Sequence, residues 1–161
     1  MLETRALTTA ENFQRLVPAY RDKDVIVFEE GLVGFPSAKR FILIESASLS
    51  PFRILKCVDN PQIGFLVLDP RAVIKTYERS ISLESWRSLE VVDKSDQLTL
   101  VISIIGKNPQ ESTANLQAPL LINHRKMLGR QLILTTVRYS VTQKLLPCLH
   151  PSASRHASSV V

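Results

Sequence analysis

Short apolar runs separated by turn-forming residues dominate the first half of the chain. Four of them follow in quick succession, and Gly, Pro, Asn, Asp or Ser stand between them: 25–28, 41–44, 52–58 and 63–68. This alternation is typical of β-strands joined by turns. The tight link at 59–62 predicts that the last two form a hairpin.

The clearest strand pattern lies further along, at residues 97–105. Leu and Ile occupy alternate positions there, and the opposite face also becomes apolar near its end. Such a strand is covered on both faces, so we expect it at the centre of the sheet. Two more strands are predicted at 115–123 and 129–137. Pro119 indicates that the first of these lies at an edge or carries a bulge.

One helix is predicted at residues 82–89. Leu83 and Trp86 share its apolar face, and its first residue is a serine suited to the N-cap position. Residues 73–78 are predicted as a further short strand. Many short strands with one short helix predict a mainly β protein: a single small antiparallel β-barrel-like domain.

This domain is expected to span residues 24–146. Residues 1–23 carry apolar side chains compatible with one face of a short helix or with an edge strand, and the pattern leaves both open. The tail at 147–161 contains Pro, Ser and His and is predicted to be disordered.

The turn at residues 29–36 has an unusual composition. It is built on two glycines and a proline, yet a solvated loop would not carry its three apolar side chains: Leu32, Val33 and Phe35. Apolar side chains in a turn need a place to be buried. Either this turn folds over the end of the sheet, or it meets a partner.

Composition and charge fit a cytoplasmic globular protein. The net charge is +5, and the basic residues are scattered except for one short run at 124–126. Nucleic-acid-binding proteins usually cluster their charge beside aromatic residues, so no direct nucleic-acid binding is expected. No secretory signal and no apolar run of about 18 residues is present, so no membrane association is expected. The two cysteines, Cys57 and Cys148, are expected to be reduced thiols.

The search for catalytic chemistry gives nothing. His124 is the one histidine of the predicted domain, and no spacing typical of a metal site or a phosphate-binding loop occurs. We therefore expect no enzyme activity, no metal and no cofactor. A small-molecule or nucleotide-binding β-barrel module is the alternative class, although the cyclic-dinucleotide signature is missing.

With catalysis set aside, binding to a partner is the class of function that remains for this chain. Turns and a proline-broken strand leave backbone N–H and C=O groups open to a partner segment. We expect one end of the barrel to hold a partner site, with these candidate residues: Leu32, Val33, Phe35, Pro36, Asn60, Pro61, Asp69, Pro70, Asn115, Pro119 and Asn123.

Five segments, in this order along the chain, carry a family resemblance. They are Val-Ile-Val-Phe-Glu-Glu-Gly-Leu-Val-Gly-Phe-Pro at 25–36, Pro-Phe-Arg-Ile-Leu at 51–55, Phe-Leu-Val-Leu-Asp-Pro at 65–70, Ser-Thr-Ala-Asn-Leu-Gln-Ala-Pro-Leu-Leu-Ile-Asn at 112–123 and Gly-Arg-Gln-Leu-Ile-Leu at 129–134. Together they resemble the flagellar assembly factor FliW family of bacterial flagellin-binding proteins.

The resemblance implies a small monomeric barrel without catalysis that binds newly made flagellin in the cytoplasm. It also implies an alternative partner, the RNA-binding regulator CsrA, which represses translation of the flagellin message. Flagellin that accumulates would then take up the assembly factor and free the regulator by mass action. The net basic charge of this chain departs from the acidic surface expected to meet a basic regulator.

Overall fold

A nine-stranded sheet forms the body of the protein in the computed structural model, which describes residues 19–135 and 138–145. Its strands are β1 (Ile26–Phe28), β2 (Arg40–Ile44), β3 (Phe52–Cys57), β4 (Gly64–Leu68), β5 (Gln97–Ile104), β6 (Thr113–Ala114), β7 (Leu120–Asn123), β8 (Leu128–Gln131) and β9 (Gln143–Lys144). The helix α2 (Leu83–Arg87) is accompanied by single 3-10 turns: η1 (Asp22–Asp24), η2 (Ala47–Leu49), η3 (Pro70–Ala72), η4 (Tyr77–Ser80), η5 (Lys94–Asp96) and η6 (Pro109–Glu111).

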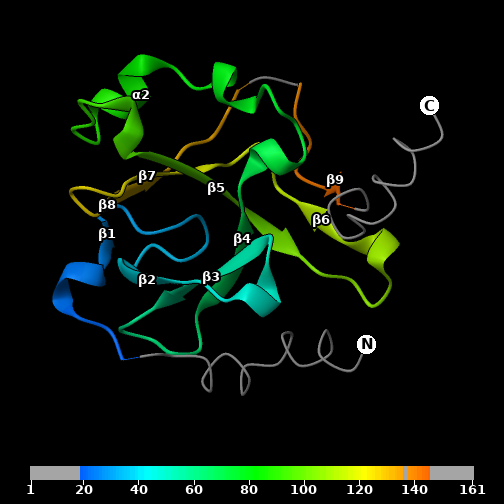
Figure 1. Ribbon diagram of the computed structural model, residues 1–161, viewed down its shortest axis with the longest axis horizontal. Coiled ribbons are helices and arrows are strands. Elements are labelled where there is room, and N and C mark those ends of the chain that lie inside the picture. The colour runs from blue at the N-terminus through cyan, green and yellow to red at the C-terminus, as the bar shows by residue number, and fades with distance from the viewer. Residues whose placement is uncertain (1–18, 136–137, 146–161) are drawn as a thin grey trace.

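Seven of these strands close into a barrel. Their order is β4-β3-β2-β1-β8-β7-β5, and pairing between β4 and β5 completes the ring. The neighbours are antiparallel except β1 and β8, which run parallel. Strands β6 and β9 extend the sheet beside the end of β5 (Figure 1). Within the described residues, the predicted mainly β, barrel-like fold with one short helix is confirmed.

Alternate residues of the barrel strands fill its interior. Phe28 and Phe41 meet edge to face there, with ring centroids 5.4 Å apart, among Leu, Ile and Val side chains. Gly129 is required opposite Phe28, because a Cβ atom would lie 2.5 Å from the ring. The barrel therefore encloses a packed core.

A second core lies on the outer face of β4, β5, β7 and β8. The segment that carries η3, η4 and α2 covers this face, and its α2 end lies at the top of the view in Figure 1. The side chains of Tyr77 and Trp86 are buried beneath it, and the Tyr77 hydroxyl donates a hydrogen bond to the Leu116 carbonyl. Ser82 caps α2 as predicted, since its Oγ accepts from the Ser85 N–H at 3.3 Å.

Several local predictions are confirmed and others are wrong. The pairing of β3 with β4 confirms the hairpin predicted for 52–58 and 63–68. The pairing of β5 with β4, β6 and β7 confirms the central position of the 97–105 strand. The predicted strand at 73–78 is wrong, because that segment is irregular and leads into η4. Residues 1–18, 136–137 and 146–161 lie outside the described residues, as do the predictions made for them.

The predicted strand at 115–123 is also shorter than expected. It begins only after Pro119, and β7 then pairs with both β5 and β8, so it is not an edge strand. Proline has no N–H to give to a ladder. The residues before it bond elsewhere: the Leu116 N–H donates to the Ser140 carbonyl at 3.0 Å.

Candidate partner-binding surface

The strand register separates the candidate residues between two ends of the barrel. The turn at 31–36 joins β1 to β2, and the link carrying Asn60 and Pro61 joins β3 to β4 at the same end. Pro119, at the start of β7, also lies there, because β7 begins opposite the last residue of β8. We call this the turn end. Asp69, which follows β4, and Asn123, which closes β7, lie at the opposite end, called the helix end because α2 packs there.

The conformation of the turn depends on its glycines. Gly31 and Gly34 have φ values of 68° and 84°, in the left-handed region. The Leu32 N–H donates to the Phe35 carbonyl at 3.1 Å, and the Phe35 N–H donates back to the Leu32 carbonyl at 2.7 Å. This small closed loop turns Leu32 toward the barrel and leaves Val33 and Phe35 exposed.

Leu32 closes the turn end of the barrel. Its side chain is buried in the interior cluster with Phe28 and Phe41. For this residue, the first of the two explanations given by the sequence holds: the turn folds over the end of the sheet.

Val33 and Phe35 lie on the outside of the same turn. The Val33 side chain is 67% exposed and that of Phe35 is 39% exposed. The Val33 N–H donates to Gln131 Oε1 at 2.8 Å, and the Phe35 ring packs edge to face on Phe65 at 5.3 Å. These contacts tie the turn to β8 on one side and to β4 on the other, so its apolar tip is held in place.

The polar candidates mostly stabilise the chain locally. The amide of Asn123 is buried: its Nδ2 donates to the Leu89 carbonyl at 2.9 Å, and its Oδ1 accepts from two following backbone N–H groups. The Oδ1 atoms of Asn60 and Asn115 each accept from the N–H two residues on. These bonds within the chain account for asparagine at all three positions, so no binding partner is needed to explain them.

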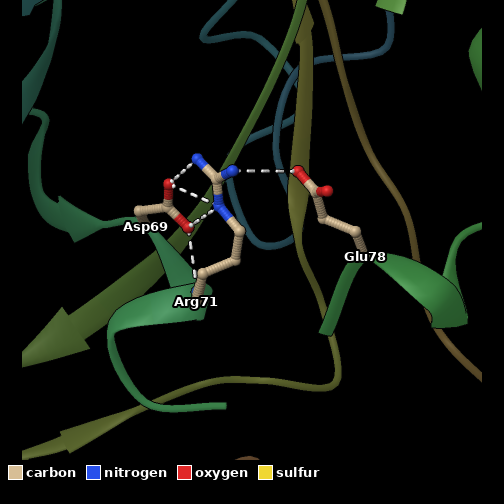
Figure 2. A network of polar contacts seen from close by, with 3 residues as sticks. All are labelled: Asp69, Arg71 and Glu78. Carbon is tan, nitrogen blue, oxygen red and sulfur yellow. Dashed lines mark hydrogen bonds and ion pairs between the residues drawn. The ribbon is translucent and has the colours of Figure 1, made fainter. Parts of the chain in front are cut away.

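Asp69 belongs to a network of charges at the helix end. It caps η3 by accepting from the Arg71 N–H at 2.8 Å, and its carboxylate binds the Arg71 guanidinium (Figure 2). Arg71 also reaches Glu78, with 3.5 Å between Nη1 and Oε1. The hydrogen bonds that the Arg71 guanidinium donates to the Asp69 carboxylate raise the pKa of Arg71. The Asp69 carboxylate is therefore already bonded to a residue of its own chain.

Five of the eleven candidates remain exposed, and the structure brings them together at the turn end. We call them the turn-end surface: Val33, Phe35, Pro36, Asn60 and Pro61. Leu32, Pro70, Pro119 and Asn123 are buried. Sequence reasoning missed Ile133, which is exposed just beyond β8 at the same end, because it was assigned to the interior of a longer strand.

No catalytic arrangement emerges from the described residues. Within them, no three His, Cys, Asp or Glu side chains are grouped so that they could hold a metal ion. His124 Nε2 donates to the Ser95 carbonyl, 2.7 Å away, and Cys57 is a buried free thiol. No helix among residues 19–135 and 138–145 is long and apolar enough to cross a membrane.

Comparison with known proteins gives the family. The family described as FliW protein matches residues 12–145. The chain belongs to the FliW family of flagellar assembly factors. Curated relatives of this family include the flagellar assembly factor FliW of Geobacillus kaustophilus, which is 36% identical over 126 residues, covering 78% of this chain and 87% of the relative. The FliW of Caldanaerobacter subterraneus is 38% identical over 128 residues, covering 79% and 85%.

A solved FliW structure also matches the fold. The crystal structure of a flagellar assembly factor FliW superimposes with a TM-score of 0.73 at 35% identity, covering 81% of this chain and 91% of the other. The family resemblance inferred from the five ordered segments is thus confirmed.

Proposed function

We propose that this FliW family member binds newly made flagellin in the cytoplasm as a monomer without catalytic activity. We further propose that it binds the translational regulator CsrA as an alternative partner. Accumulating flagellin then draws the assembly factor away, and the freed regulator silences flagellin synthesis by mass action.

The observation that carries this proposal is the exposed apolar tip of a turn that is otherwise fixed. Leu32 anchors the turn in the core, while Val33 and Phe35 present apolar area to solvent. A surface already held in its bound shape loses little conformational entropy when a partner covers it. The turn-end surface is therefore the first place at which we expect flagellin to bind.

Local charge at the turn end supports the second partner. Glu29 and Glu30 are exposed beside the turn, and neither forms an ion pair with another described residue. Opposite potentials speed and orient association even when the whole chain has the other sign. A basic regulator therefore finds a small acidic area here although the net charge is +5.

Calorimetric titration of purified flagellin into the full chain tests the proposal. Saturable binding is expected. Truncating Phe35 to Ala removes apolar contact worth about 1.5–3 kcal/mol, or roughly tenfold to a hundredfold in Kd. The matched control is Val141→Ala, which also shortens an exposed apolar side chain.

Three results would contradict parts of the proposal. If wild-type protein gives no binding heat with flagellin, the flagellin arm fails. If Phe35→Ala lowers stability and leaves Kd unchanged, the site is elsewhere and Phe35 is only a cap on the core. If CsrA added to the flagellin complex binds without displacing flagellin, partner switching fails.

A further inference from the structure

A groove of about 540 Å³ lies at the helix end, between η4, α2 and the start of β5. Its floor is apolar and is formed by Ile81, Trp86 and Val91. It is separate from the turn-end surface, because Gln97, which lines it, begins β5 at the end of the barrel opposite the 31–36 turn.

Unpaired positive charge surrounds this groove. Four cations line it: Lys75, Arg79, Arg87 and Lys94. All four are exposed, and none forms an ion pair with a described residue. The one acid in the lining is Glu78, whose carboxylate already faces Arg71 (Figure 2). The groove therefore presents uncompensated positive charge to whatever enters it.

Exposed apolar side chains stand beside these charges. Leu83 is 72% exposed and Val92 is 95% exposed, and both line the groove. The sequence pattern placed Leu83 on the buried face of its helix. In the folded chain Trp86, and Leu89 just beyond the helix, reach the core, whereas Leu83 is left to solvent.

We propose that this groove docks an acidic amphipathic segment of a protein partner. The apolar face of that segment packs on Leu83, Val92 and the groove floor, and its carboxylates pair with the four cations. Such pairing of an apolar seam with complementary rim charge is how grooves recognise amphipathic helices. This docking goes beyond the proposed flagellin and CsrA function and does not rest on it.

The same chemistry disfavours a nucleic acid. Proteins that bind single strands stack bases on exposed aromatic rings. Trp86, the aromatic residue of the groove lining, is only 6% exposed and offers no ring face to a base. The apolar Leu and Val side chains have no group that could hydrogen-bond to a phosphate.

Tryptophan fluorescence gives a direct test, because Trp86 is the only tryptophan of the chain. The probe is a synthetic peptide with leucines at helical spacing i, i+3, i+4 and i+7 and glutamates between them. Its control has lysine at each glutamate position. We expect the acidic peptide to change the Trp86 emission saturably, with binding at least tenfold tighter than that of the lysine peptide and weakened by added salt.

Charge reversal locates the site. Lys75→Glu with Lys94→Glu should weaken acidic-peptide binding at least tenfold. The matched control, Lys107→Glu with Lys144→Glu, makes the same change of net charge on exposed lysines outside the lining and should change it less than twofold. Equal weakening by both pairs would mean that only net charge acts, and would overturn the proposal.

Apolar contact is tested in the same titration. Leu83→Ser should weaken binding about fivefold, whereas Ile104→Ser, a comparably exposed residue outside the lining, should have no effect. The proposal is overturned if the acidic peptide does not bind the wild-type chain. It is overturned equally if single-stranded RNA binds through Lys75 and Lys94 more tightly than the peptide does.

Discussion

The two glycines of the 31–36 turn differ in a way that stability measurements can resolve. Both have positive φ, so Ala at either position costs about 1–2 kcal/mol in backbone strain. A Cβ on Gly34 would meet nothing within 4 Å, whereas one on Gly31 would lie 2.5 Å from the Pro36 carbonyl oxygen and 2.6 Å from that of Phe35. Those atoms are backbone and cannot turn aside. Gly31→Ala must therefore open the turn.

Opening the turn has a cost that follows from its contacts. The two hydrogen bonds that join Leu32 to Phe35 contribute about 0.5–1.5 kcal/mol each. Partial exposure of the Leu32 side chain adds about 1–2 kcal/mol. We expect Gly34→Ala to lower the free energy of unfolding by about 1–2 kcal/mol and Gly31→Ala by about 3–7 kcal/mol.

Urea denaturation followed by Trp86 fluorescence measures both variants against the wild type at one pH and temperature. The slope m should stay the same, so that the shift in midpoint reports stability alone. The reasoning is refuted if Gly31→Ala is no more destabilising than Gly34→Ala. It would also be refuted if both were harmless, because then neither φ would be positive in solution.

Two further predictions concern buried groups. Leu32→Ala should lower the free energy of unfolding by about 2–4 kcal/mol. Val33→Ala, one residue on and exposed, should change it by less than about 0.5 kcal/mol. Equal effects of the two variants in urea denaturation would contradict the assignment of Leu32 to the core. Tyr77→Phe keeps the buried ring but leaves the Leu116 carbonyl without its donor, so we expect the free energy of unfolding to fall by about 1–3 kcal/mol. Thermal unfolding unchanged from the wild type would show that this bond does not stabilise the fold.

Strand positions could be predicted from the sequence, because strand formation leaves a local record of alternating side chains and turn residues. The particular pairings that close the predicted barrel could not. They are β4 with β5 and β1 parallel to β8, and both join segments far apart in the chain. The strand predicted at 73–78 was wrong because an apolar run does not indicate a strand alone. The segment that covers the outer core also needs apolar side chains in order to pack on it.

The candidate site was predicted in part. Glycine and apolar residues indicated a candidate binding turn at 31–36, but a spacing along the chain does not say which end of the barrel a residue reaches. Asn60 and Asp69 flank the same strand, β4, and therefore lie at opposite ends. Asn123 looked like an open strand residue and is buried by its bonds to neighbouring backbone.

Places where side chains break the pattern of the local structure are the most informative about function in this chain. Val33 and Phe35 are apolar in a turn, and Leu83 is apolar on a helix that turns it to water. Folding alone gives no reason for Val33 and Leu83, since a polar residue at either exposed position would cost nothing. Scattered exposed apolar residues are ordinary. Here, however, one group stands on a turn held by contacts on both sides, and the other stands beside four unpaired cations. That physical context, more than exposure itself, is the reason to test the two ends as separate binding surfaces.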